Sequence, residues 1–127
     1  MSGEFKRLST PGQIGRVEVR NRIVMAPMGT ALCEPDGRYS RRQIDYYAER
    51  ARGGAGLIIT ELSRVESRID RRLPTMACAD SDLFVPAMVD LADAVHGFGA
   101  KLVLQLTAGF GRQFPLVDPH NPPVSSS

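Results

Sequence analysis

Three short apolar runs punctuate the chain, and longer segments with helical spacing separate them. A strand that is covered on both faces shows no polar alternation, so each run predicts a buried strand. The runs are residues 23–26, 57–60 and 101–106. Ahead of them, the first twenty residues place turn residues, Pro11-Gly12 and Gly15, between the apolar residues Ile14, Val17 and Val19, and this alternation predicts a small hairpin.

Two amphipathic segments lie between the predicted strands. The first follows Ser40, which has with Gln43 the spacing of a capping box, and it ends at Gly53. In a capping box each of the two side chains satisfies a backbone N–H of the other residue. The second segment follows a long polar stretch, residues 63–82, and has Pro86 near its first turn. Its predicted apolar face is Val85, Met88, Val89, Ala92 and Val95.

The order of these elements, β-α-β-α-β, predicts an α/β fold with a parallel sheet and right-handed crossovers. A doubly wound sheet and a (β/α)8 barrel both fit that order. No GxGxxG turn follows the first strand, which argues against a dinucleotide-binding doubly wound fold. A complete barrel takes ~250 residues and eight strands, and the three strands predicted here, about three β/α units plus the N-terminal hairpin, cannot close one.

Composition excludes several classes of protein. With 43% hydrophobic and 24% charged residues the chain has an ordinary globular composition, and its formal charge of +2 gives no argument for nucleic acid. No run approaches the ~18 apolar residues that a membrane span needs. Cys33 and Cys78 are too few for a metal cluster or a disulfide scaffold. We therefore expect a reduced, cytoplasmic protein without a nucleic-acid or membrane partner.

Candidate chemistry gathers where the strands end, because ligands of parallel α/β sheets bind at the carboxyl ends of the strands. Pro27 and Gly29 form either a plain strand terminator or a place where backbone approaches a ligand. Gln105 puts an amide inside an apolar strand, so it either bonds a neighbouring backbone group or reaches into a site. Glu61 is an isolated strand-end carboxylate that either serves as a base or, as is more usual for such a group, pairs with an arginine such as Arg64.

An ordered set of segments resembles the old yellow enzyme family. The likeness is colinear from about Leu8 to Arg112. The residues from 105 to 112 are similar to the 2-enoate and 2,4-dienoyl-CoA reductase branch. The segments that carry the family resemblance are 21–28 (ending in Met25-Ala26-Pro27-Met28), 36–37, 46–61 (ending in Thr60-Glu61), 93–96 and 99–106.

The resemblance implies an FMN-containing (β/α)8 barrel. Such enzymes take hydride from NADH or NADPH and pass it to the β-carbon of an activated alkene, an enone or enoyl thioester. By resemblance Pro27, Met28 and Gly29 lie along the flavin ring, and Gln105 hydrogen-bonds its pyrimidine edge. Leu62 stands at a flavin-bordering position where a small residue is frequent in the family. The resemblance assigns no catalytic acid or base and no metal ligand in this chain.

The same resemblance places other parts of the family's site downstream of Ser127. These are the substrate-anchoring pair, the proton-donating tyrosine, the phosphate site and the cysteines of an iron–sulfur cluster. We therefore expect residues 1–127 to be a partial FMN-binding (β/α)8 barrel domain, truncated before the later strands. It would retain FMN weakly or not at all without the remainder of the barrel or a partner chain. The alternative is a non-catalytic remnant or an interaction module that pairs its open edges with a partner.

Overall fold

The computed structural model describes residues 5–66 and 75–108. It contains the predicted hairpin, the predicted strands and both predicted helices. In chain order the elements are β1 (Gly12–Ile14), β2 (Val17–Val19), β3 (Val24–Met25), α1 (Arg41–Arg52), β4 (Leu57–Arg64), β5 (Ala77–Cys78), the 3-10 helix η2 (Asp82–Phe84), α2 (Val85–His96) and β6 (Lys101–Thr107).

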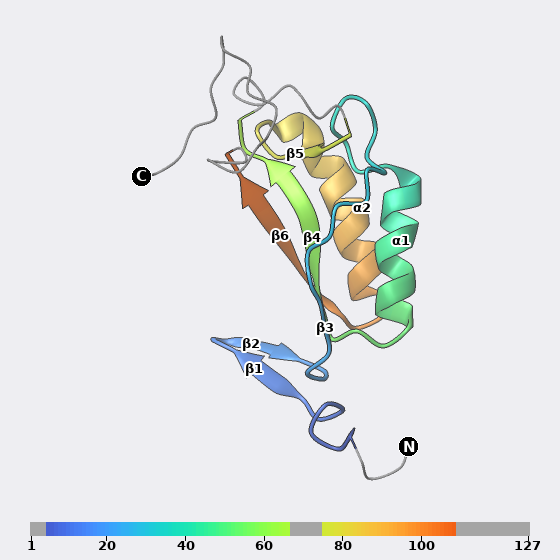
Figure 1. Cartoon of the computed structure of the whole chain (residues 1–127), viewed down its shortest axis with the longest axis vertical. Coiled ribbons are helices and arrows are strands. Elements are labelled where there is room, and N and C mark those ends of the chain that lie inside the picture. Colours follow the sequence, from blue (N-terminus) through green and yellow to red (C-terminus); the bar gives the residue numbers. More distant parts are fainter. Residues whose placement is uncertain (1–4, 67–74, 109–127) are drawn as a thin grey trace.

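Strand β4 is the centre of a parallel sheet. It pairs with β6 along one edge, and with β3 and β5 along the other, β3 at its amino half and β5 at its carboxyl end. Helices α1 and α2 lie side by side against one face of this sheet (Figure 1). The predicted parallel β-α-β-α-β arrangement is confirmed. Strand β5 was not predicted, because it falls in the polar stretch 63–82 and has only two residues.

The hairpin of β1 and β2 lies near the amino ends of the strands (Figure 1). Gly15 makes its turn with a φ of +58°, which favours glycine. Arg20, directly after the hairpin, donates hydrogen bonds to the carbonyl oxygens of Phe98, Ala51 and Ala55 at 2.5–3.0 Å. The hairpin is thereby tied to the loops that enter the strands, at the end of the sheet opposite to the strand carboxyl ends.

Helix α1 begins at Ser40, whose Oγ accepts a hydrogen bond from the backbone N–H of Gln43 at 3.1 Å. Only this half of the predicted capping box forms. The Gln43 side chain turns away from the helix terminus and donates to Glu61 on β4. The helix ends at Gly53, and Gly54 follows with a φ of +111°.

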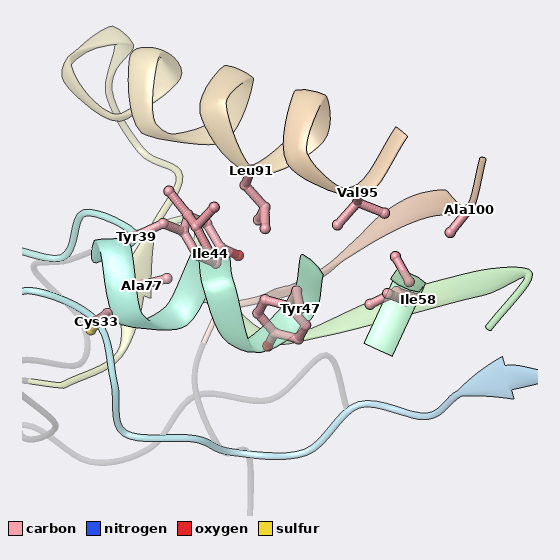
Figure 2. Close-up of a cluster of buried hydrophobic side chains, with 10 residues drawn as sticks. Cys33, Tyr39, Ile44, Tyr47, Ile58, Ala77, Leu91, Val95 and Ala100 are labelled. Atoms are coloured by element: carbon pink, nitrogen blue, oxygen red, sulfur yellow. The ribbon is translucent and has the colours of Figure 1, made fainter. Parts of the chain in front are cut away.

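The hydrophobic core lies between the two helices and the sheet (Figure 2). Tyr47, Ile58, Leu91 and Val95 are completely buried there. The predicted apolar face of α2 was partly wrong, because Val89 is exposed and Leu91 takes the inward position. Apolar residues surround much of this helix, so its spacing did not define one face. Phe84, just before the helix, is also buried.

The two faces of the sheet differ in how they are covered. The covered face is defined by the side chains that pack with the core under the helices: Met25, Ile58, Leu102 and Leu104. The bare face is defined by the side chains that alternate with them: Val24, Ile59, Leu62, Val103 and Gln105. Val24 and Val103 are each 47% exposed, so the expectation of burial on both faces was wrong for β3 and β6, whereas every residue of β4 is buried or half-buried.

No helix within residues 5–66 and 75–108 has the length and apolar character needed to cross a membrane.

Candidate functional site

A cavity of about 520 Å³ opens on the bare face, near the carboxyl ends of β3, β4 and β6. Its volume falls within the roughly 300–1,000 Å³ that small-molecule and cofactor sites occupy. All five residues that the resemblance assigned to the flavin line this one cavity. The complete lining is Pro27, Met28, Gly29, Ala31, Glu61, Leu62, Thr75, Met76 and Gln105. Sequence reasoning missed Ala31, Thr75 and Met76, which lie in loops without a recognisable motif.

A β-bulge between β4 and β6 sets the direction of the side chains at this cavity. Ile59 pairs with Val103, but the next pair in register is Leu62 with Gln105, so two residues of β4 oppose one of β6. The extra residue turns Leu62 to the bare face beside Gln105. At the bulge the Gln105 backbone N–H has a side-chain acceptor, because it donates to the Thr60 hydroxyl at 3.3 Å.

The Gln105 side chain is half-buried at the cavity wall. Its amide has no hydrogen-bond partner within the described residues, although its backbone N–H is bonded to Thr60. Of the two interpretations that the sequence left open, a bond to a neighbouring backbone group is therefore not the one found. The amide is free to donate and accept toward a ligand in the cavity.

Gly29 leaves the backbone open to the cavity. A Cβ at this position would meet nothing within 4 Å, and Gly29 is not among the residues with positive φ. Neither crowding nor backbone conformation therefore requires glycine here. Its neighbour Met28 is 57% exposed, and Ala31, two residues on, has a φ of +53° that L-residues rarely adopt.

Glu61, which is part of the cavity lining, is almost completely buried. Its carboxylate accepts hydrogen bonds from the Gln43 side-chain amide at 2.5 Å and from the Thr30 backbone N–H. These partners replace the ion pair with Arg64 that the sequence suggested. The Glu61 backbone N–H donates to the Tyr47 hydroxyl at 2.9 Å. Burial raises the pKa of Tyr47, so its hydroxyl stays neutral at physiological pH.

The lining fits a flat heteroaromatic ring better than a charged ligand. It is largely apolar, and within its described residues there is no lysine or arginine. The unpartnered Gln105 amide matches a ring edge that carries both donors and acceptors. The backbone at Gly29 has the open approach that a ring stacked along it needs.

The NADH:flavin oxidoreductase / NADH oxidase family matches residues 7–127. The chain belongs to this family. Two relatives show the extent of the likeness. Cinnamate reductase of Clostridium sporogenes is 43% identical over 116 residues, which are 88% of this chain and 17% of that protein. NADH oxidase of Thermoanaerobacter brockii is 44% identical over 102 residues, which are 80% of this chain and 16% of that protein.

Solved structures of the family confirm the barrel architecture. The old yellow enzyme from Trypanosoma cruzi superposes with a TM-score of 0.70 at 36% identity, covering 80% of this chain and 27% of that enzyme. A 2-naphthoyl-CoA reductase gives a TM-score of 0.74 at 27% identity, covering 81% and 16%. The sheet and helices described above are thus a portion of a (β/α)8 barrel. The chain spans about one sixth of the length of the curated relatives compared above.

Proposed function

We propose that this chain forms the ring-binding wall of an FMN-dependent ene-reductase. The enzyme would take hydride from NADH or NADPH and pass it to an activated C=C bond in an enone or enoyl thioester. Family membership supports the flavin and the nicotinamide donor. The names of two relatives support an activated alkene as the substrate. They are cinnamate reductase and, at 37% identity, the NADH:acrylate oxidoreductase of Vibrio harveyi.

The observation that carries this proposal is the unpartnered Gln105 amide beside Leu62 and Gly29 in one apolar cavity. When FMN is bound, it supplies the hydride chemistry, and the protein supplies orientation and exclusion of water. Gln105 would hold the pyrimidine edge of the ring, and the backbone of Pro27, Met28 and Gly29 would lie along it. Leu62 and Met76 would keep water from that side of the cavity.

The cavity lining also bears on the rest of the cofactor. It includes the acidic residue Glu61, and within its described residues there is no lysine or arginine for a phosphate. The FMN phosphate must then be held by other groups. The exposed Val24 and Val103 on the bare face support the same inference, since apolar strand residues of a barrel normally face packed side chains. We propose that activity requires further strands, from a longer polypeptide or from a partner chain.

A titration with two flavins tests the proposal. The 127-residue chain is labelled with 15N and titrated with lumiflavin, which has the ring alone, and with FMN. We expect both to shift the amide resonances of Met28, Gly29, Leu62 and Gln105, with similar dissociation constants, because the phosphate gains no partner here. AMP serves as the control for a phosphate without a flavin and should leave these resonances unmoved. The proposal fails if saturating lumiflavin moves none of them.

We also propose a cytoplasmic location. Cys33 and Cys78 are both free and buried. Burial, with a smaller contribution from the Glu61 carboxylate, raises the pKa of the Cys33 thiol to about 12, so it stays protonated and unreactive at neutral pH. Fractionation of the source cells tests the location, and recovery of the protein outside the cytoplasm would contradict it.

A further inference from the structure

The backbone of residues 29–31, which forms part of the cavity wall, needs contacts with other elements to keep its conformation. Ala31 has a φ of +53°, in the left-handed region that residues with a Cβ rarely occupy. Gly29, at the other end of this segment, is exposed, and a Cβ added there would meet no atom within 4 Å. The segment is therefore an open strip of backbone with one unfavourable conformation, and its own sequence does not enforce that conformation.

Thr30, the middle residue of the strip, is held by hydrogen bonds from both its backbone and its side chain. Its backbone N–H donates to the Glu61 carboxylate. Its hydroxyl accepts from the Gln43 side-chain amide at 3.3 Å and from the Leu32 backbone N–H at 3.3 Å. The strip is thus attached to strand β4 through Glu61 and to helix α1 through Gln43.

Glu61 is itself held in a rigid setting. It lies in the β-bulge of β4, and its own backbone N–H is bonded to the Tyr47 hydroxyl. The Gln43 amide must present its Nε2 to the Glu61 carboxylate, which leaves Gln43 Oε1 buried with no hydrogen-bond partner among the described residues. An unpartnered buried oxygen is unfavourable for folding. The contact between Gln43 and Glu61 thus leaves one buried polar atom of Gln43 unsatisfied.

We propose that Glu61 and Gln43 are positioning residues that hold the Thr30 N–H, and through it the Gly29–Ala31 backbone, in the conformation that faces the flavin ring. This inference rests on the proposed function for the identity of the ligand. The competing explanation is that the two side chains only attach α1 to β4. Under that explanation their loss lowers stability but leaves ring binding by the folded chain unchanged.

Two substitutions of Glu61 separate these explanations. Glu61→Met removes the acceptor for the Thr30 N–H and keeps the length of the side chain. Glu61→Gln keeps an acceptor oxygen, and its new amide can donate to the unpartnered oxygen of Gln43 after that side chain turns over. Tyr39→Phe is the matched control, because it deletes the buried hydroxyl contact to Ser63 at 2.7 Å and leaves the strip untouched.

Two measurements are made on each variant of the 127-residue chain. The first is the hydrogen-exchange rate of the Thr30 amide without any flavin, and the second is the dissociation constant for lumiflavin. For Glu61→Met we expect exchange at Thr30 to be at least tenfold faster and lumiflavin to bind about fivefold more weakly. Glu61→Gln should stay within about twofold of the unsubstituted chain in both measurements, and Tyr39→Phe should match it in both.

Several results would overturn the proposal. One is unchanged exchange at Thr30 in Glu61→Met, and another is faster exchange with unchanged lumiflavin binding. Loosening of Thr30 by Glu61→Gln as large as that by Glu61→Met would also overturn it. If Glu61→Met does not fold, Gln43→Met replaces it with the same expected directions. If the unsubstituted chain binds no lumiflavin, the proposed function fails, whereas exchange at Thr30 still decides whether Glu61 holds the strip.

Discussion

The covered face and the bare face of the sheet come from the same strands but have different surroundings. On the covered face, Ile58 packs with Leu91 and Val95 of α2 and is fully buried (Figure 2). On the bare face, Val24 and Val103 are half exposed and the cavity lies near the strand ends. Within β6, Leu102 packs against the core whereas its neighbour Val103 is half exposed, so neighbouring residues of one strand have different environments.

Because of this difference, we assign the stability of the fold to the covered face of the sheet and ligand binding to its bare face. Side chains of the covered face exchange water for close packing, which is the largest favourable contribution to folding. Side chains of the bare face have few internal partners, and Gln105 in particular has an unused amide. Substitutions on the covered face should therefore change the free energy of unfolding, and those on the bare face should change flavin affinity.

The largest effect is expected for Leu91→Ala. Leu91 is 0% exposed in the core, so its truncation should leave a cavity and lower the free energy of unfolding. Substitutions of this kind cost about 2–5 kcal/mol. Urea denaturation followed by circular dichroism measures the loss. The control is Val89→Ala on the same helix, where the side chain is 50% exposed and the change should stay below about 1 kcal/mol. Equal losses in the two variants would mean that the covered face is not the stabilising one.

A smaller loss of stability is expected for Tyr47→Phe. The substitution removes the hydroxyl that accepts from the Glu61 backbone N–H and leaves that buried group without its partner. Such a group costs about 1–3 kcal/mol, which urea denaturation detects. Tyr46→Phe is the control, because Tyr46 is only partly buried and its ring contact with Tyr47 remains. If the Tyr47→Phe variant were as stable as Tyr46→Phe, the Tyr47 hydroxyl would not contribute to the stability of β4.

Much of the covered face could be predicted from local sequence. The apolar runs located β3, β4 and β6, Ser40 and Gly53 located the ends of α1, and Gly15 marked the hairpin turn. The cavity residues that lie at strand ends also followed from sequence, because parallel strands bring their carboxyl ends to one edge, whereas Ala31, Thr75 and Met76 did not. Pro27 and Gln105 therefore line the same cavity although they are far apart in the chain.

What could not be predicted depends on pairing between distant elements. The bulge after Ile59 arises from the register of β4 against β6, and no local pattern announces it. Gln43 has the spacing of a capping residue, yet its side chain donates to Glu61, 18 residues away, because the carboxylate is buried beside it. The orientation of α2 likewise depends on what packs against it.

The bare face is tested by Gln105→Leu. The substitution removes the amide and keeps the bulk, so the free energy of unfolding should change by less than about 0.5 kcal/mol, as for positions without internal partners. Lumiflavin should bind about two- to tenfold more weakly, which corresponds to the roughly 0.5–1.5 kcal/mol of one neutral hydrogen bond. Lys101→Met, at the opposite end of β6, is exposed and distant from the cavity, so it should leave lumiflavin affinity unchanged. A Gln105→Leu variant that lost stability and kept its affinity would reverse the roles assigned to the two faces.

The smallest effect is expected for Gly29→Ala, and it is the sharpest test of what the bare face is for. A Cβ at Gly29 meets nothing within 4 Å and φ there is not positive, so the folded state should accept it without strain. Stability should stay level or rise by about 0.4–1 kcal/mol, because the unfolded chain loses freedom. Gly54→Ala is the matched control. Its Cβ also meets open space, but its φ is +111°, so it should lose about 1–2 kcal/mol. Lumiflavin should bind Gly29→Ala up to about threefold more weakly, because the added methyl group takes up space on backbone that we propose lies along the ring. If Gly29→Ala instead loses as much stability as Gly54→Ala, glycine at this position serves the backbone, and its openness to the cavity is no argument for a ligand.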